Sequence, residues 1–206
     1  QTSSPKASLQ PPVKKRFVPR RLVFMAADRL MMHLDNLRYV VWNNVDGKDT
    51  IRLEDTVFND NPNNSRKKRI HLNTAQWVDL RMYADQITTV TRVEGSAQED
   101  ERRWHLGGNV YATIKKGWPF VDFRKFWIPE DCIRKDCMLP GDFQVRPSKH
   151  GISLTYEEWY RLTELMEPFE STIPGLKEQQ SCLMDHANQM GMLRCSHCNP
   201  NGCSTW

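Results

Sequence analysis

Two stretches decide the fold, namely Met32-His-Leu-Asp-Asn-Leu-Arg-Tyr-Val-Val-Trp42 and Trp104-His-Leu-Gly-Gly-Asn-Val-Tyr-Ala-Thr-Ile114. At an offset of 72, a histidine, a leucine and a tyrosine recur in register. A second pair of blocks follows in the same order at an offset of 82, with Ile70, Leu72, Trp77 and Leu80 recurring as Ile152, Leu154, Trp159 and Leu162. Two ordered matches predict a duplicated domain rather than a solenoid.

Each predicted copy begins with antiparallel strands. Residues 39–42 are β-branched or aromatic, which is typical of a strand, and Asp46 and Gly47 beyond them form a strong hairpin signal. Residues 50–58 predict the partner strand, and residues 69–72 predict a further short one. We therefore expect three or four antiparallel strands in each copy.

One amphipathic helix is expected after the strands. Asn73 and Gln76 have the spacing of a capping box, as do Thr155 and Glu158. Apolar side chains follow at helical intervals, and Pro168 is expected to end or kink the second helix early. A copy of about 60 residues buries too little surface to be stable alone. The predicted fold is therefore α+β, with two tandem copies of a curved antiparallel sheet and one C-terminal helix, packed as an intramolecular pseudo-dimer.

Composition favours a globular protein. The 206 residues suffice for one or two domains, and 39% of them are hydrophobic. No stretch approaches the roughly 18 apolar residues of a membrane helix, and no signal-peptide pattern is seen. The expected segments are a basic, proline-containing, disordered tail (1–21), a first copy (22–94), an acidic linker (95–101), a second copy (102–170) and a Cys/His-containing tail (171–206).

The net charge of +4 hides an asymmetry. Residues 1–21 hold six basic side chains and no acidic ones, whereas the remaining chain holds 23 basic and 25 acidic side chains. The run Lys14-Lys-Arg16 lies between prolines and predicts a nuclear-import signal or a DNA-binding arm, with a merely solvated tail as the alternative. We accordingly expect a nuclear protein.

Four of the six cysteines fall within the last 25 residues. Cys195 and Cys198 have the spacing of half a zinc site, and Cys182 and His186 supply a candidate second half, for which Cys203 competes. An unstructured tail and disulfide use are the alternatives. Zinc is therefore the one cofactor that the sequence suggests.

The ordered set of motifs resembles a known family. Phe120-Val-Asp-Phe-Arg-Lys-Phe-Trp127 and the stretch from Ser148 to Leu162 resemble the core of the positive-cofactor-four family of transcriptional coactivators, and Trp104 to Ile114 resembles its first strand. The resemblance implies a homodimer of four-stranded sheets with helices at the interface, which binds single-stranded or unpaired DNA. Two fused copies would do the work of that dimer in one chain.

Unpaired nucleic acid is held by cations that neutralise phosphates and by rings that stack on bases. The resemblance matches Arg124, Trp127 and the hairpin tip to the family's DNA contacts. Strand alternation puts Arg124 and Trp127 on opposite faces, so a bulge or twist must join them or only one contacts DNA, and Trp127 has the core as its alternative. The candidates in the second copy are Lys115, Lys116, Trp118, Arg124, Trp127, Arg146 and Lys149.

The first copy departs from this pattern, because Glu54 and Val57 stand where the second has Arg124 and Trp127. An asymmetric site is therefore expected, with stacking mainly on the second copy. The first-copy candidates are Arg38, Trp42, Lys48, Arg52 and the run Arg66, Lys67, Lys68 and Arg69, which is alternatively a solvated loop.

The sequence thus predicts a single-stranded DNA-binding protein that acts in transcription or replication. The rival hypothesis is an interaction or structural module that kept the fold and lost the site. Enzymatic activity is not expected, because no nucleophile elbow, phosphate-binding glycine loop or informative carboxylate pair is present. Contacts with transcription or replication machinery and further self-association remain open.

Overall fold

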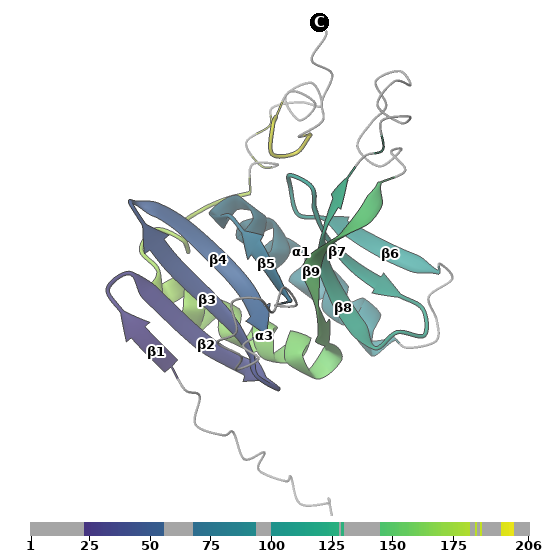
Figure 1. Ribbon diagram of the computed structural model, residues 1–206, viewed down its shortest axis with the longest axis horizontal. Coiled ribbons are helices and arrows are strands. Elements are labelled where there is room, and N and C mark those ends of the chain that lie inside the picture. The colour runs from purple at the N-terminus through teal and green to yellow at the C-terminus, as the bar shows by residue number, and fades with distance from the viewer. Residues whose placement is uncertain are drawn as a thin grey trace, which may run out of the picture.

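Alternating polar and apolar side chains build two antiparallel sheets, each followed by a helix (Figure 1). The computed structural model describes residues 23–55, 68–93, 100–127, 129, 145–181, 184, 186 and 195–199, so the basic tail lies outside it. The first sheet contains β1 (Val23–Ala26), β2 (Arg29–Asp35), β3 (Arg38–Val45), β4 (Lys48–Asp55) and β5 (Arg69–Leu72), followed by α1 (Thr74–Arg92). The second contains β6 (Glu101–His105), β7 (Val110–Lys115), β8 (Phe120–Trp127) and β9 (Arg146–Thr155), followed by α3 (Tyr156–Thr172).

The predicted α+β class is confirmed, with one strand more than expected in the first sheet. That strand, β1, pairs with β2 at the sheet edge. Strand β6 begins at Glu101, the last residue of the segment expected to be a linker. Among the described residues, no helix is long and apolar enough to cross a membrane.

Tight turns with positive φ angles shape both sheets. Asp46 and Gly47, with φ of 53° and 74°, close the predicted hairpin between β3 and β4. The stretches 32–42 and 104–114 each contain parts of two strands joined by a turn, although 104–114 was expected to resemble one strand. Their turns place Asn36 and Leu37, and Gly107 and Gly108, at positive φ.

Both helices start as their capping boxes predict. Asn73 Oδ1 accepts a hydrogen bond from the backbone N–H of Gln76 at 2.8 Å, and Gln76 Oε1 accepts one from the N–H of Asn73 at 2.9 Å. Thr155 and Glu158 exchange the equivalent bonds at 3.2 and 2.8 Å. These bonds satisfy backbone donors that the first helical turn leaves without partners.

The expected early end of the second helix is wrong, because α3 continues past Pro168 to Thr172. Phe169 and Glu170 in this last turn are both buried. Packing of that turn against the body therefore outweighs the hydrogen bond that the proline ring removes.

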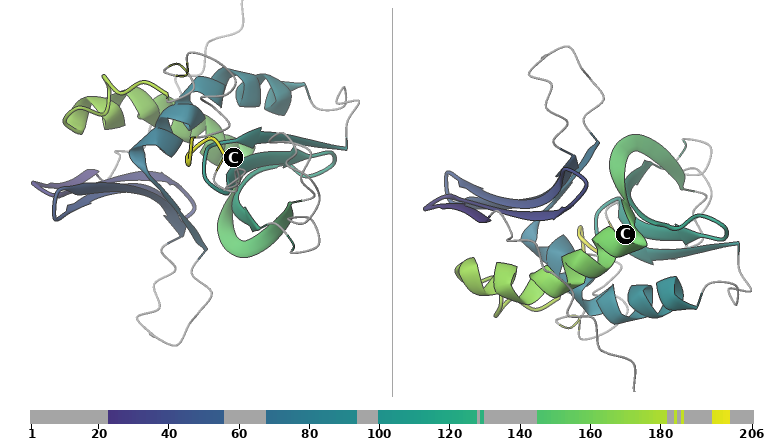
Figure 2. Two further views of the ribbon diagram at one scale, coloured as in Figure 1. Left: turned by 90° about the horizontal axis from the view of Figure 1, so that it is seen from above. Right: turned by 90° about the horizontal axis from the view of Figure 1, so that it is seen from below.

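Both helices lie on the same side of the two sheets (Figure 2). Helix α1 contacts β4, β5 and β7, while α3 contacts β2, β8 and β9, so each helix touches both sheets. Strands β5 and β9 lie side by side where the sheets meet (Figure 1). One cluster of buried hydrophobic side chains consequently runs through both sheets and both helices.

Two buried tryptophans tie the helices to each other. The indole Nε1 of Trp77 donates to Glu170 Oε1 at 2.8 Å, and that of Trp159 donates to Thr88 Oγ1 at 3.0 Å. Neither tryptophan is exposed to solvent, so both belong to the core. Each indole thus fills the core and satisfies its polar atom within it.

Truncation of either core tryptophan is expected to destabilise the fold. Trp77→Ala and Trp159→Ala should each lower the free energy of unfolding by about 3–5 kcal/mol, because each leaves a large cavity. Urea unfolding followed by circular dichroism measures the change. Trp118→Ala is the matched control, since Trp118 is 61% exposed, and it should unfold like the wild type. Equal stability of all three variants would contradict this assignment.

Candidate nucleic-acid interface and Cys/His cluster

A groove lies on the face of the second sheet that points away from the helices. Along β8, Val121 and Phe123 are buried, and the Phe123 ring packs 6.0 Å from that of Trp159, centroid to centroid. The alternate residues face the groove, which has a volume of about 400 Å³. Four cations, two acids and three aromatic side chains line it: Arg103, Lys115, Arg124 and Lys149; Glu101 and Asp122; Trp118, Phe120 and Phe126.

The cations of the groove are partly neutralised by its acids. Arg124 forms two hydrogen bonds with Asp122, from Nε to Oδ2 at 2.8 Å and from Nη2 to Oδ1 at 3.0 Å, and this pairing raises the pKa of Arg124. Glu101 is ion-paired with Arg103, and its Oε2 lies 3.3 Å from Lys115 Nζ. A phosphate bound here must therefore compete with a carboxylate for each of these three cations, whereas Lys149 is exposed at the groove.

The hairpin tip between β7 and β8 presents an exposed ring beside basic side chains. Trp118 is 61% exposed, and its ring lies 6.1 Å from that of Phe120 in an edge-on arrangement. Lys115 and Lys116 next to it are exposed. The structure thus brings together the predicted hairpin residues at one end of the groove.

Trp127 does not lie on the same face of the sheet as Arg124. The two side chains alternate to opposite faces of β8, and Phe126 lines the groove instead. The irregularity lies in β9, where the residues opposite Arg124 and Phe126 are Gly151 and Pro147. Trp127 is 46% exposed, which excludes the core alternative, and the guanidinium carbon of Arg146 lies 5.7 Å from its ring centroid. The pair therefore forms a separate exposed patch at the ends of β8 and β9.

Gly151 lets β9 curl closely over β8. A Cβ atom at this position would lie only 2.5 Å from the backbone oxygen of Phe123. Any other residue would push the strands apart beside Arg124, so the glycine shapes this side of the groove.

Sequence reasoning missed the aromatic floor of the groove. The guanidinium carbon of Arg103 lies 4.6 Å from the ring centroid of Phe126 and 5.8 Å from that of Tyr111. The two rings themselves are 4.9 Å apart, edge to face. The same strand alternation that separates Arg124 from Trp127 was sufficient to identify Phe126.

Two candidates in the first sheet, Trp42 and Arg38, have surroundings that do not suit contact with DNA. Trp42 is 6% exposed and donates from Nε1 to Asp49 Oδ1 at 2.9 Å, so it belongs to the core and is not available for stacking. Arg38 is ion-paired with the buried carboxylate of Glu158 and donates to the carbonyl oxygen of Ser153. Its charge therefore joins the two halves of the molecule and does not reach a phosphate.

The remaining first-copy candidates differ in their surroundings. Lys48, Lys68 and Arg69 are exposed. Arg52 Nε lies 3.5 Å from Glu54 Oε2, so the Glu54 carboxylate partly neutralises the charge of Arg52. Arg66 and Lys67 lie outside the described residues.

Cations from both sheets meet around His71 on β5. Burial lowers the pKa of His71, and the charges of Arg69, Arg52 and Lys125 lower it further, while Glu54 opposes the shift. Lys125 lies on β8, in the other sheet, and was not among the predicted residues. The junction of the sheets thus carries positive charge contributed by both.

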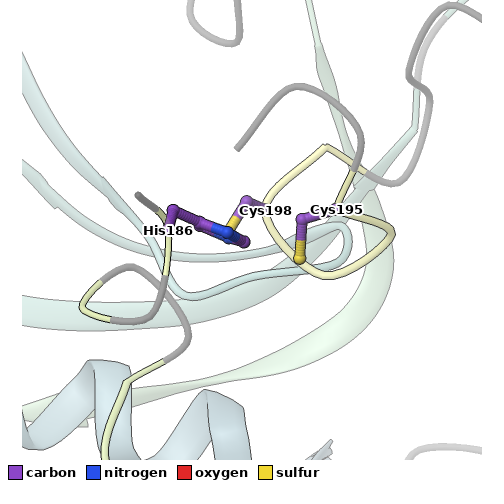
Figure 3. A group of neighbouring side chains, drawn as sticks. All are labelled: His186, Cys195 and Cys198. Atoms are coloured by element: carbon purple, nitrogen blue, oxygen red, sulfur yellow. The ribbon is translucent and has the colours of Figure 1, made fainter. Parts of the chain in front are cut away.

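Three of the four predicted metal ligands converge near the C-terminus (Figure 3). The ligating atoms of His186, Cys195 and Cys198 all lie within 4.8 Å of one another, and Cys182 lies outside the described residues. Burial alone would raise the pKa of Cys195, but hydrogen bonds from the backbone of Cys198 and His197 and from neighbouring side chains lower it to about 7. This cluster therefore favours a thiolate, the form that binds metal.

No model of a known protein family matches this chain.

Replacing Arg38 is expected to affect stability rather than binding. Arg38→Ala should lower the free energy of unfolding by about 1–3 kcal/mol, because it leaves the buried Glu158 carboxylate without its cation. Lys48→Ala, at an exposed hairpin position, should change stability little and serves as the control. Thermal melts combined with oligonucleotide binding of the folded protein test this, and a variant that melts normally yet binds weakly would contradict it.

Proposed function

We propose that this chain binds single-stranded or unpaired DNA through the groove of its second sheet. The observation that carries the proposal is the combination of cations and aromatic rings along one groove. Lysines and arginines at such a surface neutralise phosphates, and exposed rings stack on bases regardless of sequence. The resemblance to the positive-cofactor-four coactivators supports the same activity, with a role in nuclear transcription or replication.

We also propose that the chain is a duplicated unit folded as a pseudo-dimer. The two indole bonds support this, because Trp77 and Trp159 are 82 residues apart and their acceptors, Thr88 and Glu170, are also 82 apart. Each donor bonds the acceptor of the other half, as a two-fold axis requires of paired contacts.

The first turn of each helix also forms a hydrogen bond with the other half of the chain. Gln76 Nε2 donates to the backbone oxygen of Gly107 at 2.9 Å, and Glu158 Oε1 accepts from Asn36 Nδ2 at 3.2 Å. In both cases a helix of one half bonds a hairpin turn of the other.

The two halves contribute unequally to the proposed site. Glu54 lies beside Arg52, Trp42 is buried and Arg38 is paired with Glu158. The first half therefore retains cations around His71 but lacks the exposed rings of the second, so bases would stack on the second sheet while phosphates extend toward β5.

A protein-interaction module remains the second candidate. The acids within the groove favour it, because Asp122 and Glu101 already pair with three of its four cations, namely Arg124, Arg103 and Lys115. A partner with both charge signs would suit such a groove as well as a nucleic acid does. Salt dependence of oligonucleotide binding separates the two functions.

Oligo-dT binding measured by fluorescence anisotropy at two salt concentrations is the direct test. The wild type should bind, and its affinity should fall steeply as salt rises. Trp118→Ala should weaken binding by about 1–3 kcal/mol, because a stacking ring is lost. Lys149→Ala should weaken binding and make the salt dependence shallower by about one phosphate contact.

Two variants serve as controls in that assay. Trp127→Ala removes an exposed tryptophan on the opposite face, and Lys177→Ala removes an exposed lysine beyond α3, so neither should weaken binding. Weaker binding by Trp127→Ala alone would move the site to the patch that it forms with Arg146. Wild-type protein without salt-dependent oligo-dT binding would refute the proposed function of the body.

The His71 imidazole should report whether DNA crosses the junction of the sheets. Its pKa is lowered by burial and by three surrounding cations, so the neutral form prevails at neutral pH. A bound phosphate opposes these cations and should raise the pKa of His71. NMR titration of the imidazole with and without oligo-dT measures the shift, and an unchanged pKa in the complex would confine the DNA to the second sheet.

A further inference from the structure

The cysteine turn near the C-terminus has the atoms of a metal site in place. His186 Nε2 lies 3.3 Å from Cys198 Sγ, and Cys195 Sγ completes a triangle whose sides do not exceed 4.8 Å (Figure 3). Tetrahedral zinc, with bonds of about 2.3 Å to sulfur and 2.0 Å to nitrogen, sets its ligand atoms roughly 3.5–3.8 Å apart. The three side chains therefore need to shift only slightly to hold such an ion.

The backbone of the turn is arranged to support a bound thiolate. The Cys195 sulfur accepts hydrogen bonds from the backbone N–H groups of His197 and Cys198. The N–H of Asn199 donates to the Cys195 carbonyl oxygen at 2.8 Å and closes the turn. Cys198 is 5% exposed, so its sulfur faces His186 rather than water. Two sulfurs and one imidazole form a donor set that binds zinc in preference to magnesium or calcium.

His197 lies within the same turn but serves a different purpose. Its Nε2 lies 2.8 Å from Oδ2 of Asp79, a carboxylate of helix α1 that is only 2% exposed. Its carbonyl oxygen accepts a 2.6 Å hydrogen bond from the N–H of Gly108, in the turn between β6 and β7. His197 thus anchors the cysteine turn to two elements of the folded body and is not a ligand.

The folded body has a space that fits the His197 ring. A Cβ atom at Gly107 would lie 2.0 Å from the His197 ring, so only glycine leaves room for the imidazole. Asp79 also accepts a hydrogen bond from the Ser181 hydroxyl, so its two oxygens both hold the segment that follows α3. These contacts hold the turn that carries Cys195 and Cys198 against the folded body.

We propose that His186, Cys195 and Cys198 bind one Zn²⁺ ion, and that His197 couples this zinc site to the body through Asp79 and Gly108. The ion closes the C-terminal turn, and the docked turn then covers the place where the start of α1 meets the β6–β7 turn. The fourth coordination position is filled by water or by a further ligand. Metal binding should consequently stabilise the body as well as the tail.

Metal analysis of the full chain, loaded with Zn²⁺ under reducing conditions and then dialysed, tests the ligand set. The wild type and the control Cys137→Ser should retain about one zinc per chain. Cys195→Ser and Cys198→Ser should each lose most of it, whereas His197→Ala should keep it. Equal loss in His197→Ala and Cys198→Ser would overturn the assignment of His197 as an anchor. A Cys195–Cys198 disulfide in the protein as purified under native conditions would overturn the site itself.

Cobalt titration of the wild type gives a test that no folding defect can confound. One equivalent of Co²⁺ should produce a thiolate-to-metal charge-transfer band and the intense visible bands of tetrahedral coordination, and Zn²⁺ should remove them. The absence of these bands would refute the site.

Thermal melts with and without metal test the coupling. Zinc should raise the melting temperature of the wild type by several degrees and that of His197→Ala by much less, although that variant binds the ion. Equal melting temperatures for zinc-loaded and zinc-stripped wild type would overturn the coupling. Because none of these measurements involves DNA, their outcome is independent of the nucleic-acid proposal.

Discussion

The exchange of buried indole hydrogen bonds between α1 and α3 is the constraint on which the rest of the structure depends. Each helix contacts strands of both sheets, so the position of the helices also sets the position of the sheets. Trp77 and Trp159 fix how far the helices can shift, since each ring is fully buried and bonded across the contact. The relative position of the two sheets, and with it the open face that carries the groove, follows from this arrangement.

Local signals in the sequence predicted the local structure well. Asp46 and Gly47 specify a turn with positive φ, and the capping boxes at Asn73 and Thr155 mark the helix starts, since each signal depends only on residues a few positions apart. Pro168 misled for the opposite reason, because the burial of Phe169 against distant residues decides where that helix ends.

The site was harder to predict because charge alone does not reveal a partner. Arg38 and Arg124 look alike in the sequence, yet Arg38 is held by Glu158, 120 residues away, while Arg124 stays in the groove beside Asp122. Trp42 and Trp118 differ in the same way, since one is buried in the core and the other stands exposed at a hairpin tip. Alternation along β8 did separate Arg124 from Trp127. The sequence can therefore predict on which face of a strand a side chain lies, even where it cannot predict the partner of that side chain.

Because the two sheets are covalently connected, their association does not depend on protein concentration. Two separate subunits would dissociate on dilution, whereas here the second half is always present near the first at a high effective concentration. The shared core can therefore form at any expression level, and its unfolding is a unimolecular event. The single chain also means that a substitution on one sheet is not copied to the other, so the cation Arg124 on β8 can coexist with the acid Glu54 on β4.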